Sequence, residues 1–341
     1  MTGYGNNNWN PHSMHSHHQK QAIRRDSNFV GLISIAQVIL LQVISVVLIL
    51  GLSSIGIADP TDSRYFGLGN TGFLLFYSII YIVAVGLPAP IIALIARRRI
   101  SPFSDLEQAS HKEPGFLQVA LALMAGLSLC IIANYVTSYI VYFLNEIGLR
   151  PPDMPVYVEN SVVSLLLNIF TLALLPAVLE EMVYRGYILR TLLPHGKVFA
   201  IVVSSAMFAL MHGNLLQIPF AFIVGLTCGY LAVKTGKIWV AALLHFLNNF
   251  MAVVLQYAGI NLTDSQTQKV VAIAFSILGI IGLYSLIALF AAGDPGIRED
   301  KDRQQPAPAV NKTGALLSAP AIIAYLVVSV ILIVLTTRFG G

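Results

Sequence analysis

Long, nearly uncharged apolar segments recur along this 341-residue chain. Most of them reach the length of about 20 residues at which a helix crosses the hydrocarbon core of a bilayer. Because lipid offers the backbone no hydrogen-bond partners, a spanning segment must be a helix or part of a closed barrel. The alternating ten-residue pattern of barrel strands does not occur in the sequence. The sequence therefore predicts an all-α, polytopic helical bundle in a membrane.

The composition agrees with this prediction. Only 11% of the residues are charged, against roughly 25% in soluble domains. The net charge is +4, but Lys and Arg gather in short segments between apolar stretches, which orients a membrane protein and does not indicate nucleic-acid binding. Cys130 and Cys228 both lie within apolar segments, so neither a disulfide framework nor a CxxC metal site is expected.

Nine apolar segments are candidate spanning helices: 29–57, 72–96, 116–144, 161–193, 198–213, 218–234, 238–258, 268–292 and 315–337. The fifth and sixth are short for a full crossing, so eight or nine spanning helices are expected. We group the segments as N-terminal helices at 29–144, a core at 161–258, and C-terminal helices at 268–337 with a charged linker at 293–314. Residues 1–28, rich in Asn and His, are expected to form a polar, disordered tail.

The positive charges predict the orientation of the chain. With the N-terminus in the cytoplasm and the segments alternating, sixteen Lys and Arg residues fall on the inner side and four on the outer side. Cytoplasmic loops of membrane proteins carry such an excess. The sequence therefore predicts a multi-pass protein with a cytoplasmic N-terminus.

A few ionisable side chains lie inside the apolar segments. Such groups are costly in lipid and mark candidate functional sites. They are Glu180, Glu181, Arg185, His212 and His245.

Helical spacing brings part of this set to a similar level in the membrane. Glu180 and His212 lie at nearly equal distances, roughly 20 Å, on either side of an expected turn at 194–196. The next turn is expected near residues 235–237. By helical rise, His245 and Asn249 lie roughly 13 and 19 Å above it. Three helices therefore present polar groups at compatible depths.

The faces of the helices separate the roles of these residues. Glu180 and Glu181 project about 100° apart, whereas Glu181 and Arg185 are four residues apart and can form an ion pair. This leaves Glu180 as the carboxylate that can face a cavity. His245 and Asn249 are also four residues apart and project to the same side.

Pro176, one turn before Glu180, removes a backbone hydrogen bond and predicts a kink that opens space beside the carboxylate. Each feature taken singly has a plain structural explanation. A pair of glutamates often caps a helix in solvent, and a histidine in a membrane helix is often a hydrogen-bonded core residue. Their coincidence at one level favours a functional site.

Three motifs carry these residues: Glu180–Arg185 fits EExxxR, Phe208–His212 fits FxxxH, and His245–Asn249 fits HxxxN. In this order and spacing they resemble the family of type 2 CAAX prenyl endopeptidases and bacteriocin-processing or immunity proteins (CPBP or Abi), over residues 165–255. The resemblance implies an all-helical intramembrane protease, a hydrolase acting on membrane-associated peptides or lipidated proteins such as CAAX-box proteins.

The resemblance also implies catalytic roles. Glu180 is then the general base that activates a water molecule, with His212 as its partner on that water. His245 and Asn249 stabilise the oxyanion of the tetrahedral intermediate. The supporting residues are Glu181, Arg185 and Phe208.

Two mechanisms of water activation remain open. Glu180, His212 and His245 are acceptable zinc ligands, and a zinc-bound water ionises near neutral pH. However, the chain has no HExxH sequence, and the pairing of His245 with Asn249 suits an oxyanion site better than a coordination sphere. A mechanism without a metal is favoured, with a divalent metal such as zinc as the alternative.

Two other functions fit the same residues. One is a non-catalytic immunity or scaffold protein that keeps the fold. The other is a proton-coupled transporter, although such proteins often show internal repeats, and none is visible in the sequence.

Overall fold

The computed structural model describes residues 11–62, 65–106, 115–150, 159–291 and 310–339. The helices of the first half are α1 (Pro11–Ser54), α2 (Gly69–Tyr81), α3 (Pro88–Ile95), α4 (Phe116–Glu146), α5 (Val162–Asn168), α6 (Leu175–Glu181) and α7 (Arg190–Leu192). Those of the second half are α8 (Lys197–Met211), α9 (Ile218–Thr235), α10 (Ile238–Gly259), α11 (Asp264–Ala291), α12 (Lys312–Leu317) and α13 (Pro320–Thr336). Two-residue strands, β1 (Leu149–Arg150) and β2 (Arg338–Phe339), pair in antiparallel fashion.

The predicted all-α membrane bundle is confirmed. Seven helices of the described chain are long and apolar enough to cross a membrane: Ser16–Ser54, Gly69–Ile95, Phe116–Glu146, Val162–His195, Ile218–Thr235, Ile238–Gly259 and Asp264–Ala291. Two further apolar helices, Lys197–Met211 and Pro320–Thr336, are shorter. The nine predicted segments therefore all form helices, but α8 and α13 fall short of the length expected for a full crossing.

The last segment is short because it is interrupted. Ser318 and Ala319 separate α12 from α13, and Pro320 occupies the first turn of α13, where a proline fits without losing a hydrogen bond. The crossing of α13 with α1 is close: a Cβ on Gly31 would lie 2.8 Å from the backbone of Ala321. Only glycine permits this approach.

The disorder expected for residues 1–28 is wrong for the part of this segment that the structure describes. Residues 1–10 lie outside the described residues, but α1 begins at Pro11 and is helical from there. The structure holds this part of the chain through tertiary contacts that no local pattern reveals. The Asp26 carboxylate accepts a hydrogen bond from Arg98 at 2.7 Å and lies 2.9 Å from His195 Nε2.

The helix that carries Glu180 contains wide π-helical turns. They are η2 (Ile169–Leu174) and η3 (Met182–Leu189), on either side of α6; a third such segment, η1 (Ile82–Gly86), joins α2 to α3. Pro176, where a kink is predicted, is the second residue of α6 and lies two positions after the end of η2. A π-helical turn carries one extra residue and shifts the hydrogen-bond ladder.

Both predicted turns are present. A 3₁₀ turn, η4 (Leu193–His195), ends at Gly196, whose φ of +122° reverses the chain into α8. Gly236, with a φ of +72°, ends α9 and leads into α10. Both backbone conformations favour glycine.

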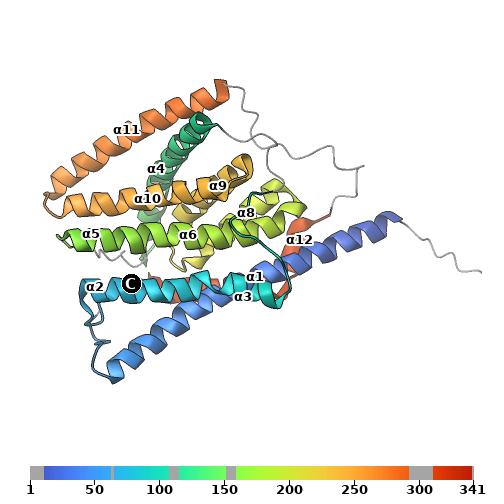
Figure 1. Cartoon of the computed structure of the whole chain (residues 1–341), viewed down its shortest axis with the longest axis horizontal. Coiled ribbons are helices and arrows are strands. Elements are labelled where there is room, and N and C mark those ends of the chain that lie inside the picture. Colours follow the sequence, from blue (N-terminus) through green and yellow to red (C-terminus); the bar gives the residue numbers. More distant parts are fainter. Residues whose placement is uncertain (1–10, 63–64, 107–114, 151–158, 292–309, 340–341) are drawn as a thin grey trace, which may run out of the picture.

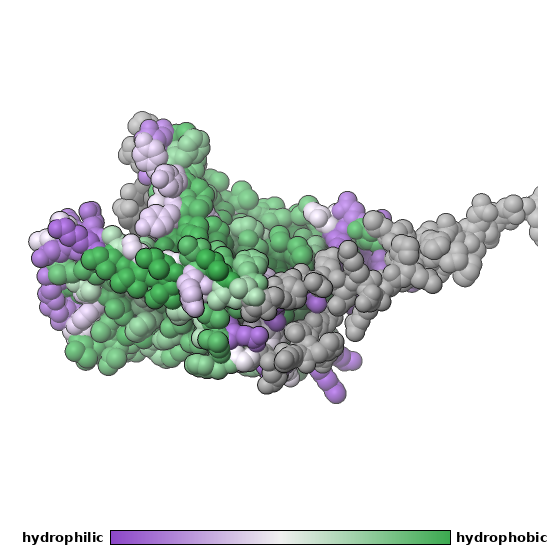
Figure 2. All heavy atoms as spheres, turned by 90° about the horizontal axis from the view of Figure 1, so that it is seen from above, coloured by the Kyte–Doolittle hydropathy of each residue, from purple (hydrophilic) through white to green (hydrophobic). Residues whose placement is uncertain are grey.

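Helices α2, α5, α6 and α10 run side by side, and α4, which is inclined to them, packs against α11 and α9 (Figure 1). The helices α2, α5, α6 and α10 surround the middle of the bundle, and α1 packs against α13. Figure 2 shows an apolar body between two hydrophilic ends.

Loops that are predicted to lie on the same side of the membrane meet at the same end of the bundle. Lys237 Nζ lies 2.7 Å from the carboxylate of Asp105, and the Arg190 side chain donates to the Ser104 carbonyl. At the other end, Asn160 donates to Asn261 at 3.1 Å.

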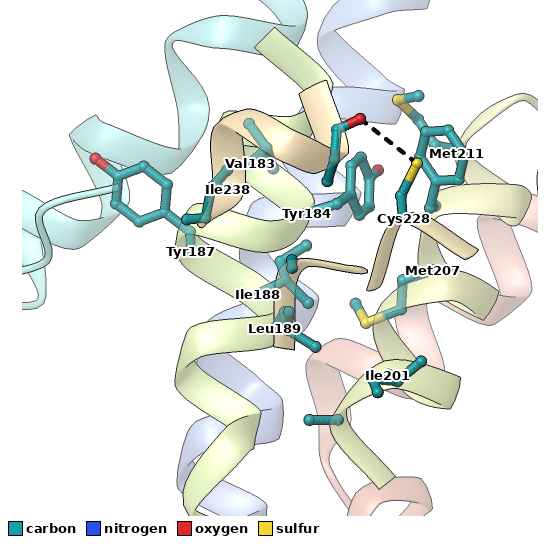
Figure 3. Packing of buried hydrophobic residues seen from close by; sticks show 14 of the residues in the cluster. Val183, Tyr184, Tyr187, Ile188, Leu189, Ile201, Met207, Met211, Cys228 and Ile238 are labelled. Carbon is teal, nitrogen blue, oxygen red and sulfur yellow. Dashed lines mark hydrogen bonds between the residues drawn. The ribbon is translucent and has the colours of Figure 1, made fainter. Parts of the chain in front are cut away.

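Buried apolar side chains of η3, α8 and α9 pack against one another (Figure 3). Ile188 and Leu189 of η3 are fully buried, and Met207 of α8 is nearly so. The thiol of Cys228 lies 3.7 Å from the Ala241 carbonyl oxygen and is not part of a disulfide. This packing fixes the helix that carries Glu180 against its neighbours.

Candidate active site

A cavity of about 820 Å³ opens within the bundle, and the four predicted catalytic residues all line it. Glu180 comes from α6, His212 follows the end of α8, and His245 and Asn249 come from α10. Residues of α1, α2, α4, η2 and α9 complete the walls. Helical rise predicts similar depths for these side chains, and in the structure they line the same cavity.

Glu180 is buried, with 2% of its surface exposed. One of its carboxylate oxygens, Oε1, accepts a hydrogen bond from the Tyr81 hydroxyl. The other, Oε2, lies 3.7 Å from His245 Nε2 and has no hydrogen-bond partner among the described residues. A buried carboxylate oxygen without such a partner beside a cavity is suited to receive a proton or bind a water molecule.

Glu181 and Arg185 form the ion pair expected from their spacing, with Arg185 NH1 2.9 Å from Glu181 Oε1. Both side chains are almost completely buried. Arg185 NH2 also donates to the Gly225 carbonyl at 2.7 Å, and the guanidinium lies 5.1 Å from the centre of the Phe208 ring. The pair thus ties η3 to α8 and α9.

His245 connects the two glutamates. Its Nδ1 lies 3.0 Å from Glu181 Oε1, while its Nε2 faces Glu180 Oε2. Their spacing predicts side chains about 100° apart on the helix, yet the two nitrogens of one imidazole face both carboxylates. Glu181 is therefore a partner of Arg185 and also orients His245, a contact that the sequence analysis did not anticipate.

His212 is held by its own helix and by an aromatic neighbour. Its Nδ1 lies 3.0 Å from the Phe208 carbonyl oxygen, and the Phe208 ring packs edge-on against the imidazole at 5.1 Å. Because a carbonyl can only accept, Nδ1 carries the hydrogen, and Nε2 of the neutral ring is left as an acceptor. The Phe208 ring also contacts His245, at 5.8 Å, and so lies against both histidines.

Asn249 is oriented by the residue before it. Asn248 Nδ2 donates to Asn249 Oδ1 at 3.0 Å, and both side chains line the cavity. With its oxygen occupied, the Asn249 amide group keeps its N–H hydrogens for donation.

Tyr81 was missed by the sequence analysis. It is the last residue of α2, it is buried, and its ring stacks on Tyr77 at 5.5 Å. Tyrosine is common in membrane helices, so its presence in an apolar segment gives no signal. Only the packing of α2 against α6 reveals that its hydroxyl reaches Glu180.

The alternative zinc site requires three suitable side chains within reach of one ion. In the part of the chain that the structure describes, no group of three or more His, Cys, Asp and Glu side chains is arranged to hold a metal ion. One nitrogen of His245 already faces Glu181, and Nδ1 of His212 faces a carbonyl. Such contacts orient a histidine whether or not it binds a metal ion, so the disagreement with a zinc site rests on the lack of a three-ligand group among the described residues.

The part of the chain that resembles known proteins, from α5 to α10, includes the helices that carry these residues. Residues 162–251 match the family model described as "Type II CAAX prenyl endopeptidase Rce1-like". The chain is also 25% identical over 134 residues to the "Putative membrane peptidase YdiL" of Bacillus subtilis (strain 168). That match covers 39% of this chain and 54% of the other protein, so the chain spans about half the length of this relative. No solved structure matches the chain. The resemblance inferred from the three motifs is therefore confirmed over residues 162–251, which are similar to the type II CAAX prenyl endopeptidases of the Rce1-like family.

Proposed function

We propose that this protein is an intramembrane endopeptidase that hydrolyses peptide bonds of membrane-associated or lipidated substrates. One observation carries the proposal: Glu180, His212, His245 and Asn249, which come from three segments of the chain, line a single cavity within an apolar bundle. The similarity of residues 162–251 to a family of membrane endopeptidases supports the same reaction class.

In the proposed reaction, Glu180 Oε2 and His212 Nε2 hold a water molecule between them. The water oxygen attacks the carbonyl carbon of the substrate while Glu180 takes up the water proton. Glu180 then passes that proton to the amide nitrogen as the carbon–nitrogen bond breaks, which releases an amine and a carboxylic acid, and the acid then gives its proton to the amine. The hydrogen bond from Tyr81 fixes the other oxygen of Glu180, so that Oε2 keeps its direction.

Negative charge develops on the carbonyl oxygen of the substrate during the attack. Donors aimed at that position lower the barrier. The Asn249 amide can donate a hydrogen bond without a change in protonation. His245 is held at Nδ1 by Glu181, so it donates from Nε2 only when both ring nitrogens carry hydrogen. We assign these two residues to the oxyanion.

The cavity suits a peptide that arrives from the membrane. Its walls include apolar residues of α1, α2 and α9, such as Leu41, Phe73 and Phe220, and amides of α4 and α10, such as Asn134 and Gln256. Apolar walls accept a lipid chain or apolar side chains, and the amides can pair with a peptide backbone.

The proposal is tested on the membrane proteome of cells that express the protein. New peptide termini are mapped by mass spectrometry in cells with the wild type, with Glu180→Gln, and with Glu146→Gln, an exposed glutamate at the end of α4. Termini that appear with the wild type and Glu146→Gln but not with Glu180→Gln are expected. Identical termini in all three samples would leave a non-catalytic scaffold or a transporter as the better explanation.

We also propose that water activation needs no metal, because His245 and Asn249, one helical turn apart, both line the cavity, and this pair suits two hydrogen-bond donors to an oxyanion better than a set of metal ligands. The purified protein is analysed for its metal content and assayed after exhaustive chelation. Activity should survive chelation. Stoichiometric zinc, with activity lost on its removal and restored on its return, would contradict this mechanism.

A further inference from the structure

A second hollow, of about 990 Å³, lies outside the candidate active site. It is formed by the first half of α1, the end of α3 with the residues that follow, and the turn after η3. The end of the bundle at which it lies also holds the contact between Lys237 and Asp105.

Positive charge gathers in this groove. Its lining contains four arginines, Arg25, Arg98, Arg99 and Arg190, and one acidic residue, Asp26. The Asp26 carboxylate is already engaged by Arg98 and by His195. The charged lining therefore carries a net positive charge that an anion would complement.

Two of the arginines are available to a ligand. Arg25 has 75% of its side chain exposed and approaches Asp26 only at 3.5 Å. Arg99 is exposed and forms no ion pair with any residue that the structure describes. Arg98 and Arg190, in contrast, are held by Asp26 and by the Ser104 carbonyl.

The other walls of the groove are apolar. Phe29 and Leu32 come from α1, and Ile92 and Ile95 from α3. Leu32 and Ile95 are 50% and 76% exposed. These residues stand where the apolar segments meet the charged loops, which is the depth at which phospholipid headgroups join their acyl chains.

We propose that this groove binds an anionic phospholipid. The phosphate lies between Arg25 and Arg99, and an acyl chain lies against Leu32 and Ile95. Arginine binds phosphate oxygens through several N–H donors at once. The apolar walls favour a lipid over a free phosphate ion, because an ion would leave them uncovered.

The test measures lipid binding by native mass spectrometry of the purified protein. The probes are dioleoyl phosphatidylglycerol and dioleoyl phosphatidylcholine, which share their acyl chains and differ in net charge. The groove variant is Arg25→Gln with Arg99→Gln. The control is Arg24→Gln with Arg97→Gln, which removes the same charge from neighbouring positions that do not line the groove. A third variant, Ala36→Phe, fills the apolar part of the groove.

The wild type should bind phosphatidylglycerol more tightly than phosphatidylcholine. The groove variant should lose affinity for phosphatidylglycerol on the order of thirtyfold, since it removes two basic residues that contribute about 1 kcal/mol each. The control should change less than about twofold. Ala36→Phe should also weaken binding, and glycerol phosphate should not displace the lipid.

Equal affinities of the wild type for the two lipids would overturn the proposal. So would an equal loss in the control variant, which would indicate a general effect of surface charge. Full binding by Ala36→Phe, or displacement by glycerol phosphate, would show a phosphate site without a lipid groove. Melting temperatures in detergent check the folding of every variant, and Arg99→Gln alone replaces the double variant if that unfolds early.

Discussion

His245 is the residue on which the arrangement of the candidate site depends most. Its two nitrogens face different carboxylates, Glu181 at 3.0 Å and Glu180 at 3.7 Å. Glu181 in turn holds the fully buried Arg185. A change at Glu181 therefore affects stability and the direction of His245 together, whereas a change at Glu180 affects the carboxylate that faces the cavity.

Glu181→Gln should destabilise the protein strongly. It leaves the buried Arg185 guanidinium without its carboxylate, and breaking a buried ion pair from one side costs about 3–5 kcal/mol. Thermal unfolding in detergent measures the effect. Glu146→Gln, at an exposed position, should stay within about 0.5 kcal/mol of the wild type. Equal stability of the two variants would mean that the buried pair contributes nothing.

Tyr81→Phe should lower kcat on the order of tenfold and leave KM nearly unchanged. The variant keeps the ring but removes the hydrogen bond that fixes Glu180, and a mispositioned catalytic group slows the chemical step without weakening substrate binding. The matched control is Tyr184→Phe, which removes another buried hydroxyl, one that donates to Gln37 at 3.2 Å. Equal kcat values for the two variants, or a change in KM alone for Tyr81→Phe, would show that Tyr81 does not position Glu180.

The sequence reveals those site residues whose charge is unusual in an apolar segment. Charged groups in apolar segments drew attention to Glu180 and Arg185, and helical spacing correctly paired Arg185 with Glu181. Tyr81 could not be found in this way, because a tyrosine agrees with an apolar helix. The contact of His245 with both glutamates depends on the rotation of α10 about its axis, which packing determines.

At the scale of helices and loops, apolar length predicted nine helical segments, and both turns expected between them are present. The sequence did not predict the helical residues before position 29. Their sequence is polar, and Asp26 holds them through Arg98 and His195, which are distant in the chain. The π-helical turns around α6 were also missed, because they require one extra residue per turn and no composition marks them.

Asp26→Asn should loosen the first part of α1. The amide cannot form ion pairs with Arg98 and His195, and hydrogen bonds to charged groups contribute about 1.5–3 kcal/mol each. Hydrogen exchange of residues 16–28 should become faster on the order of tenfold. The control is Asp105→Asn, because Asp105 is 65% exposed and its pair with Lys237 contributes little. Unchanged exchange in Asp26→Asn would mean that the helix forms without these contacts.

At the scale of the whole molecule, the two hydrophilic ends of the bundle agree with the division of its loops into two groups (Figure 2). The excess of sixteen to four in Lys and Arg predicts which group is cytoplasmic. The fold class and the alternation of the loops follow from hydropathy alone. The position of the cavity does not, because it depends on how three helices and α2 pack together.

The orientation is tested with a maleimide that does not cross membranes. A cysteine introduced in place of Ser101 should stay unlabelled in intact cells, and one in place of Glu146, at the other end of the bundle, should react. The native Cys130 and Cys228 are buried and give a low background. Efficient labelling at position 101 would reverse the predicted topology.

The central claim is that Glu180 performs peptide hydrolysis within the membrane. The most direct measurement is cleavage of a labelled membrane peptide, taken from the substrates found by terminus mapping, by the purified protein in proteoliposomes. The wild type should cleave it at one bond, and Glu180→Gln, folded and with an unchanged melting temperature, should lose activity by at least about a thousandfold. Cleavage by Glu180→Gln at the wild-type rate would contradict the account.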